Sequence, residues 1–487
     1  MGKIVQIVFI FGLFFNHAQG ESPKISLNLE DLPQLIYKEN KEVQIAKKNI
    51  LLAQYEEVAA NSPFDWNLYT SAAQEKKITN PNSAFDQGRI KEETSSLSLG
   101  TTRDFYYGTK IDLSFQLLHI QSDSLVAITP KRYQGAAKLK IDQPLLNGFG
   151  PQNIAEKLLK AKPKINRYQA EFISTFSQKL KNAVDLFWEI IAKEEEINLQ
   201  FKSIKKLIFM QNYATKANLA GQKGKMEMIE VHASLVRDQA LLEKKQGEKF
   251  QSILKLLALI DYPQDKIFSN IDQNIFFHFD SDSLLKTHLN ISEKDYLSSD
   301  HKKEEFQLEE LMVDLKQKKN RLMPKLDLQI ELTSPSLSRS ISDSLSQVSK
   351  NEFNNFKISL NFVWAIENLQ AKGEHIKAYE SYNQQELKIT NKNLSDSKLL
   401  LQKKEELKIS ETNESSLIER KEIGQKTIDI AKEMMINGNM AMPEYLEELE
   451  NLNLTEQELI EQLFKKRKLR NQINQLSGRY DDLYPNV

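Results

Sequence analysis

Residues 325–332 read KLDLQIEL, in which charged or polar residues alternate strictly with apolar ones. Residues 110–117 (KIDLSFQL) repeat the pattern. Because successive side chains of a β-strand point to opposite faces, this period of two predicts strands with one apolar and one polar face. Shorter or weaker instances are residues 357–362, 138–142, 64–69 and 97–99. We therefore expect a sheet with two unlike faces.

Two long segments with helical periodicity accompany these strands. In residues 152–219, apolar side chains recur at spacings of three and four, as at Phe172, Phe176 and Leu180, which places an apolar stripe on one face of a helix. About 67 helical residues would extend for about 100 Å at 1.5 Å per residue. Residues 369–436 form a second segment of nearly the same length. Since globular helices average about three turns, two helices of this length are informative.

Two shorter helical segments together equal the length of one long segment. Return helices are predicted at residues 226–260 and 443–476, each after a glycine-containing turn. Helical patterns at residues 302–322 and 32–60 supply the remaining length. Each long helix can therefore be matched by two shorter helices stacked end to end.

The composition excludes several classes of protein. The 487 residues include no cysteine, which excludes disulfides, cysteine-ligated metals and thiol nucleophiles. The charge is balanced, with 66 basic and 67 acidic residues, whereas a nucleic-acid-binding protein would carry a basic excess. The seven histidines show no paired metal spacing, and no GxSxG or Walker motif occurs. We therefore expect no enzyme, no metal, no cofactor and no nucleic-acid partner.

The first segment, residues 1–20, reads MGKIVQIVFIFGLFFNHAQG. A lysine, Lys3, precedes an apolar run, and the segment ends in a small-x-small cleavage site at Gly20, as in a secretory signal peptide. We expect the mature protein to begin near Glu21 and to leave the cytoplasm.

The apolar strand faces have two possible partners. In a soluble sandwich they would meet a second sheet, and in an outer-membrane barrel they would meet lipid while the polar faces line water. Aromatic residues near the strand ends fit either an interfacial belt or ordinary packing. They are Trp66, Tyr69, Phe105, Tyr106, Tyr107 and Trp364.

The same order of elements occurs twice along the chain. Helix, strands, long helix, glycine turn and return helix follow one another in residues 21–262 and again in 301–480, with a connecting segment at 263–300 and a tail at 481–487. The first strand region is longer than the second by about 40 residues. Its surplus, within about 85–125, contains two extra strand candidates that would form one added hairpin.

With this order and spacing, the chain resembles the TolC family of outer-membrane efflux channels. The most specific segments are QPLLNG at residues 143–148 and LMPKL at 322–326. The resemblance implies a mostly α fold with membrane β, and an internal two-fold structural repeat. The fold would be a trimeric outer-membrane β-barrel, with four strands from each subunit, continued by a long periplasmic α-helical barrel. The extra hairpin could be an extracellular flap or could widen the barrel.

The resemblance also implies a constriction at the periplasmic end. Acidic residues soon after the helix turns ring this opening in the family, and Glu444 and Glu447 match them after the second turn. Glu227 occupies the corresponding place after the first turn. Three-fold symmetry would bring these carboxylates around one axis and favour cations. Alternatively, Glu444 and Glu447 are carboxylates that complement the dipole of their own helix, with Pro443 in its first turn.

The two helix turns are the expected contacts for a partner. Gly221 and Gly438 permit positive φ and close helix approach, and the resemblance implies that both turns meet a periplasmic adaptor (membrane fusion) protein. Family members can lock the gate with arginine and tyrosine near the second turn. Here those positions are Met435 and Met440, so the lock of this channel would differ.

The sequence therefore predicts an outer-membrane channel-tunnel, extending into the periplasm, in a tripartite efflux or type I secretion system. It would be a passive homotrimer in outer-membrane lipid, supplied by an inner-membrane RND or ABC transporter through the adaptor. The alternative is a secreted coiled-coil structural or adhesion protein with a small β head. A secreted hydrolase is a weaker alternative, because no residue is nominated as its nucleophile.

Overall fold

The computed structural model describes residues 25–80, 89–124, 127–219, 225–262, 275–277, 298–350 and 355–483. The predicted signal peptide, the turn at Gly221 and most of the connecting segment 263–300 lie outside these ranges. The chain divides into two compact units. The strand-bearing unit comprises residues 48–170 and 301–393, and the helical unit comprises residues 1–47, 171–300 and 394–487.

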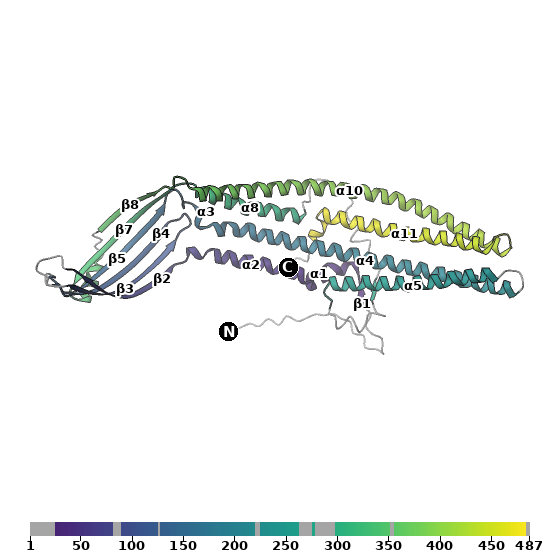
Figure 1. Ribbon diagram of the computed structural model, residues 1–487, viewed down its shortest axis with the longest axis horizontal. Helices are drawn as coiled ribbons and strands as arrows, with labels where there is room; N and C mark the ends of the chain where they lie inside the picture. The colour runs from purple at the N-terminus through teal and green to yellow at the C-terminus, as the bar shows by residue number, and fades with distance from the viewer. Residues whose placement is uncertain are drawn as a thin grey trace, which may run out of the picture. The chain divides into compact units, whose positions relative to one another are not determined.

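The strand-bearing unit contains a six-stranded antiparallel sheet in the order β2-β3-β4-β5-β7-β8 (Figure 1). The strands are β2 (Asn67–Thr79), β3 (Ile90–Asp104), β4 (Lys110–Ser122), β5 (Lys131–Pro144), β7 (Lys325–Ser338) and β8 (Asn355–Val363). Five of the six period-two segments are confirmed as strands, and the sixth, at residues 64–69, only from Asn67 onward, because Ser62–Phe64 form a 3₁₀ turn before β2. The observed strands are longer than the segments that predicted them, because pairing continues past the point where the alternation weakens.

The extra hairpin is part of this sheet. β3 pairs with β2 along all thirteen residues of β2, and β4 pairs with β5 from Lys110 to Gln121. Both strands of the hairpin therefore lie inside the sheet, where each has a partner on either side. A separate flap is not what the structure shows.

A short helix that the sequence pattern did not predict, α9 (Ile341–Ser349), packs on β5 and β7. Its serine Ser344 meets Ser336 of β7 with an Oγ–Oγ distance of 2.6 Å. A Cβ at Gly135 of β5 would lie 2.9 Å from the Ser344 hydroxyl and 3.1 Å from Val348. The absence of a side chain at Gly135 thus lets this helix approach the sheet closely.

The long helices are α4 (Glu156–Leu219) and α10 (Leu369–Ile436), and the return helices are α5 (Lys225–Leu259) and α11 (Met442–Leu476). The remaining helices are α1 (Leu32–Glu39), α2 (Lys41–Ala60), α3 (Pro151–Ile154) and α8 (Ser299–Asn320). The predicted bounds of the long and return helices are confirmed to within a few residues. Among the described residues, no helix combines the length and apolar character that crossing a membrane requires.

The helix predicted at residues 32–60 is two helices, because Asn40 separates α1 from α2. Asn40 is extended, and its Oδ1 accepts a hydrogen bond from the backbone N–H of Val43 at 3.0 Å. Its Nδ2 donates to the carbonyl oxygen of Leu259 at 2.7 Å. The same side chain thus caps α2 and ties it to the end of α5.

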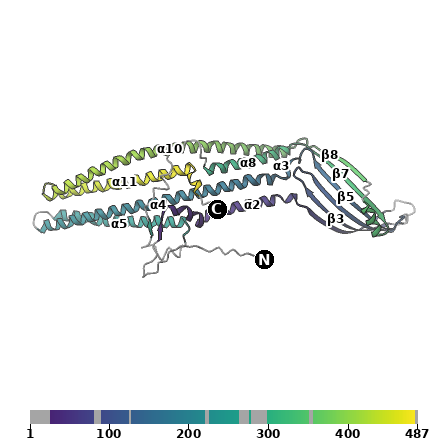
Figure 2. The same cartoon turned by 180° about the vertical axis from the view of Figure 1, so that it is seen from behind.

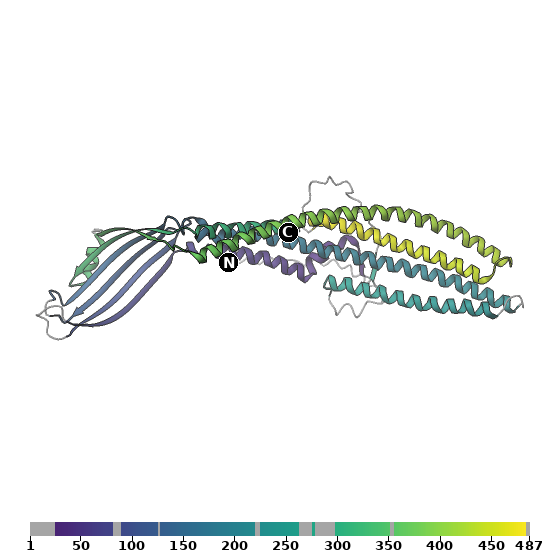
Figure 3. The ribbon, with the colours of Figure 1, turned by 45° about the horizontal axis from the view of Figure 1, so that its top comes forward.

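Parts of four helices lie side by side in the helical unit (Figure 3). The apolar stripe predicted on α4 is buried there, with Phe172, Phe176 and Leu180 all at most 7% exposed. Closer to the turns, the four helices share one apolar core. Its residues are Ile204, Leu207, Met210, Ala214, Val231, Leu235, Ile428, Ala431, Met435, Met442, Tyr445, Leu449 and Leu452.

Three further short elements belong to the helical unit. β1 (Ile25–Leu27) pairs in parallel with β6 (Ile275–Phe277). The 3₁₀ turn Arg479–Asp482 follows α11. Within it the Asp481 carboxylate accepts hydrogen bonds from Ser177 of α4 at 2.6 Å and from the backbone N–H of Ser299 at 2.7 Å. The end of the described chain thereby binds two helices distant in sequence.

Candidate functional site

One face of the six-stranded sheet is apolar over its helix-proximal part, and at the far end of β2 and β3 the same face carries the Lys76–Glu93 ion pair. Because residues paired across antiparallel strands share a face, the pairing registers assemble rows of apolar side chains. One row runs from Arg103 of β3 through Ile111, Ile141, Ile330 and Ile358. The next consists of Leu68, Thr101, Leu113, Leu139, Leu332 and Phe356.

This apolar face is exposed where it reaches β8. Phe356, Ile358, Leu360 and Phe362 are 57 to 62% exposed. Leu113, in the middle of the sheet, is 52% exposed. A contiguous exposed apolar surface of this kind marks an interaction site or a membrane-facing surface.

The opposite face is polar and charged. Lys138 and Glu331 form an ion pair at 3.2 Å, and the hydroxyl of Tyr69 donates to Asp112 at 3.1 Å. These groups gain from contact with water, and their burial against a second apolar layer would be costly. The two faces therefore require different surroundings.

Aromatic side chains gather at the helix-proximal end of the sheet. The ring of Phe64 lies 6.3 Å from that of Tyr106, Tyr106 lies 5.5 Å from Tyr107, and Tyr107 stacks on Phe149 at 6.2 Å. Trp364 follows β8 at the same end and is 61% exposed. The predicted grouping of aromatics near the strand ends is thus confirmed for this end, and Phe149 extends it.

The two sequence segments that carry the family resemblance contact each other at the helix-proximal end of the sheet. The backbone N–H of Leu145 donates to the carbonyl oxygen of Leu326 at 2.7 Å, and that of Asn147 donates to Pro324 at 3.2 Å. Figure 2 shows α3 and the end of α8 beside the ends of β5 and β7. Residues 143–148 and 322–326 therefore form one strand-to-helix junction.

Asn320, the last residue of α8, holds this junction together. Its Oδ1 accepts hydrogen bonds from the backbone N–H of Gly148 and from the Nδ2 of Asn153, both at 2.9 Å. Its Nδ2 donates to the carbonyl oxygen of Leu146 at 3.2 Å. Asn320 is only 7% exposed. A buried amide thus replaces water for backbone groups where the strand ends and α3 begins.

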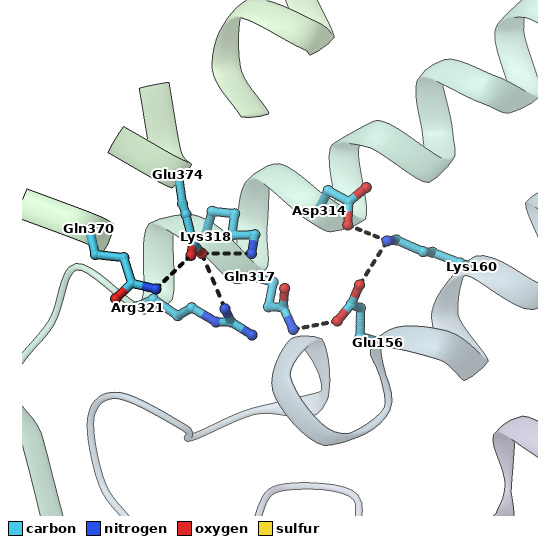
Figure 4. A network of polar contacts seen from close by, with 8 residues as sticks. All are labelled: Glu156, Lys160, Asp314, Gln317, Lys318, Arg321, Gln370 and Glu374. Carbon is cyan, nitrogen blue, oxygen red and sulfur yellow. Dashed lines mark hydrogen bonds and ion pairs between the residues drawn. The ribbon is translucent and has the colours of Figure 1, made fainter. Parts of the chain in front are cut away.

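A network of ion pairs joins the helices next to the junction (Figure 4). It consists of Glu156, Lys160, Asp314, Gln317, Lys318, Arg321, Gln370 and Glu374. Burial alone would lower the pKa of Lys160, but hydrogen bonds to Asp314 and Glu156 outweigh it and raise the pKa. The hydrogen bond from Lys318, 2.8 Å away, is the main cause of a lowered pKa at Glu374. Lys160, in one part of the network, and Glu374, in the other, are therefore held in their charged forms.

The turn after α10 has the geometry that its glycine predicts. Gly438 has a φ of +79°, and its N–H donates to the carbonyl oxygen of Met435 at 3.2 Å. The N–H of Asn439 donates to Met434 at 2.8 Å. These two bonds form a Schellman motif, which requires a left-handed residue at the position of Gly438.

The predicted acidic residues after this turn are exposed. Glu444 and Glu447 both lie on the solvent side of α11. The backbone N–H of Ala441 donates to the Glu444 carboxylate at 3.4 Å, so Glu444 also caps its own helix. A shared axis for these carboxylates would need further copies of the chain, so the constriction stays a prediction.

The two methionines at the expected gate positions lie in apolar surroundings. Met435 is fully buried in the four-helix core together with Met442 and Tyr445. Met440 packs against the same core. Burial, and the nearby Asp429 carboxylate, raise the pKa of Tyr445. The helix ends are thus held together by apolar contacts at these positions.

The corresponding region after the first turn is described only in part. Glu227 lies in the first turn of α5 and is half-buried. Its Oε2 atom has no hydrogen-bond partner among the described residues. Gly221 lies outside them, so its predicted conformation stays a prediction.

No protein-family model matches this chain, and no curated protein matches it by sequence. Solved structures match it over nearly its whole length. The outer-membrane channel OprN has a TM-score of 0.66 at 11% identity, covering 94% of this chain and 91% of that chain. The outer membrane protein VceC of Vibrio cholerae has a TM-score of 0.64 at 11% identity, covering 92% of this chain and 96% of that chain. The CmeC outer membrane channel of Campylobacter jejuni has a TM-score of 0.64 at 12% identity, covering 92% and 85%.

The chain has a TolC-like fold. At 11 to 12% identity, the likeness concerns the fold alone. It confirms the resemblance that residues 143–148 and 322–326 suggested.

Within the TolC-like fold, sequence reasoning missed Asn320 and Asp481. Neither stands in a recognisable motif, and their partners lie 172 and 304 positions away. Asn320 does lie two positions before the segment at 322–326, which was the one available signal. In the described part of the chain, no group of three or more histidine, aspartate or glutamate side chains is arranged to hold a metal ion.

Proposed function

We propose that this protein is a subunit of a trimeric outer-membrane channel. The sheet would supply part of a membrane-spanning barrel, and the long helices would supply part of a periplasmic tube. The chain would act as a passive conduit and not as an enzyme. The observation that carries the proposal is the sheet itself, which exposes an apolar face on β8 and carries the Lys138–Glu331 ion pair on the opposite face.

Lipid and water on opposite sides explain this sheet. Lipid covers apolar side chains without requiring a second protein layer, and a water-filled lumen solvates the charged face. The aromatic residues at the helix-proximal end would then lie at the membrane–water interface, where amphipathic rings are favoured. A sheet with open edges is not stable in lipid, because its edge N–H and C=O groups find no water. Closure between subunits removes the edges.

The helix ends would form the periplasmic entrance. Glu444 and Glu447 would line a cation-favouring constriction in the trimer, with Glu227 in the neighbouring position. Gly221 and Gly438 would contact a periplasmic adaptor. The adaptor would connect the channel to an inner-membrane RND or ABC transporter, in a tripartite efflux or type I secretion system.

The mass and conductance of the purified protein test this function. Extraction should require detergent, and the protein mass measured by light scattering should correspond to three chains. In planar bilayers the trimer should conduct with a preference for cations. A monomer released without detergent would contradict the proposal and favour a secreted coiled-coil protein.

A variant pair tests the constriction separately. Glu444→Gln combined with Glu447→Gln should weaken the cation preference without preventing assembly. The control is Glu461→Gln, an exposed carboxylate further along α11, which should leave the preference unchanged. Equal selectivity in all variants would remove Glu444 and Glu447 from the constriction.

A further inference from the structure

The edges of the six-stranded sheet are β2 and β8. Among the described residues, β2 pairs only with β3, and β8 pairs only with β7. Six alternating strands give β2 and β8 opposite directions. If β8 of one copy meets β2 of another, their pairing is therefore antiparallel, as everywhere else in the sheet.

The pairing registers show how far the sheet is sheared. The row of paired residues that begins at Asn67 continues through Thr102, Asp112, Lys140, Glu331 and Lys357. Lys357 lies six positions before Val363, the helix-proximal end of β8. The strand ends thus step steadily along the strand direction from β2 to β8.

This shear corresponds to the tilt of a membrane barrel. Five steps between strands cover about 24 Å, and six residues cover about 20 Å along a strand. A line through the helix-proximal strand ends is therefore inclined by about 40° to the perpendicular of the strands. Strands in closed barrels tilt by about 35–45° from the barrel axis. The sheet is already sheared as a section of a barrel wall.

The tilt also selects a register between copies. In a symmetric barrel, Asn67 of every copy lies at the same height along the axis. Lys357 of β8 lies in the same row as Asn67 of its own copy. The offset along the strands that accumulates over the six steps to the next copy therefore equals the distance on β8 from Lys357 to the residue that pairs with Asn67 of the next copy. If that partner is Val363, the tilt is about 35°. A partner two positions further on would lie beyond the end of β8.

Several side-chain pairs across the two edges agree with this register. On the polar face, Ser71 would lie opposite Ser359. On the apolar face, Leu68 would lie opposite Phe362. Glu75 would lie diagonally opposite Lys357 of the other copy, within reach of an ion pair. Ala72 opposite Ile358 also agrees, whereas Asn67 opposite Val363, Ala73 opposite Lys357 and Gln74 opposite Phe356 each join a polar and an apolar residue.

We propose that β8 of each copy pairs with β2 of the next in this register, so that three copies close a barrel of eighteen strands. The inference rests on the proposed trimeric channel. At a tilt of about 35°, eighteen strands enclose a backbone cylinder about 34 Å wide, whereas twelve strands enclose one about 23 Å wide. The added hairpin thus widens the membrane pore.

Cysteine cross-linking tests the edge directly, because the natural chain has no cysteine. The double variant Ser71→Cys with Ser359→Cys should form disulfides between copies, since directly opposed residues have Cα atoms about 4.5–5.5 Å apart. Within one copy these residues are five strands apart, so an internal disulfide is impossible. Complete oxidation should yield covalent trimers on a denaturing gel.

A second pair of cysteines distinguishes the eighteen-stranded barrel from a narrower one of twelve strands. If β2 and β3 stayed outside a twelve-stranded barrel, β4 would be the edge, and the same reasoning places Ser114 opposite Ser359. Ser114→Cys with Ser359→Cys should therefore stay unlinked, as should each single variant. Cross-linking of this pair would overturn the eighteen-stranded barrel.

Three further results would count against the inference. A Ser71→Cys, Ser359→Cys protein that stays unlinked in a trimer of confirmed mass would refute the edge pairing while leaving the channel intact. Stronger linking of Ser71→Cys to a cysteine at Lys357 or Asn361 would refute the register. Failure to form any trimer would refute the proposed function, and with it this inference.

Discussion

Replacing Asn320 by alanine should open the strand-to-helix junction. The side chain makes three hydrogen bonds, to Gly148, Asn153 and Leu146, and is nearly buried. Each lost bond costs about 1 kcal/mol, and more where a buried partner stays unpaired. We expect Asn320→Ala to lower the local opening free energy by about 3 kcal/mol, which corresponds to about 100-fold faster exchange of a protected amide.

Amide hydrogen exchange of the detergent-solubilised protein measures this effect. The Gly148 amide, which donates to the Asn320 side chain, should exchange about 100-fold faster in Asn320→Ala. The Leu145 amide, bonded to the backbone of Leu326, should change much less. Asn320→Asp is the control variant, because it keeps the oxygen that accepts from Gly148. Unchanged exchange at Gly148, or equal acceleration at Gly148 and Leu145, would refute the role of Asn320.

Three further predictions concern other parts of the chain. Gly438→Ala should destabilise the turn by about 1–2 kcal/mol, because φ is positive there, seen as faster amide exchange confined to the turn. Tyr480→Phe removes the hydroxyl that donates to buried Asn471 and should lower the denaturant midpoint by an amount equivalent to about 1–2 kcal/mol. Burial opposes ionisation of Glu156, yet hydrogen bonds, mainly from Lys160, lower its pKa below 4.5. Its contribution to stability should thus be present above pH 4.5 and be lost as the pH falls through the lowered value, a pH dependence that Glu156→Gln should reduce.

The strands and the long helices could be predicted because their patterns are local. The alternation at residues 325–332 depends only on neighbouring residues, and it predicts β7 because successive side chains of a strand point to opposite faces. The same holds for the apolar stripe of α4. Residues 369–436 predict α10 over its full length, because they contain no proline and because Gly438 follows them.

The junction and the caps could not be predicted from the sequence. Asn320, Asn40 and Asp481 act on backbone groups that are distant in the chain, and their residue types are common in loops. The short helix α9 was missed because residues 341–349 are rich in serine, which has no strong helix preference. Its position depends on a glycine in another strand, Gly135, and no local pattern reveals this contact.

The candidate site was predicted in part. Gly438 has the conformation expected of it, and Glu444 and Glu447 are exposed as a constriction would require. That they share an axis in a trimer stays a proposal. The internal repeat also stays a prediction. The burial of Met435 could have been inferred from its spacing with Ile428 and Ala431 on one helix face.

Accessibility of the two sheet faces in lipid tests the central claim most directly. Single cysteines at Ile358 and Ser359, adjacent residues on opposite faces of β8, can carry a nitroxide spin label in the reconstituted protein. The account predicts that the label at 358 is accessible to oxygen, which concentrates in lipid, and shielded from a water-soluble nickel complex. The label at 359 should show the reverse. Equal accessibility of both labels to the nickel complex would contradict a sheet with lipid on one side and water on the other.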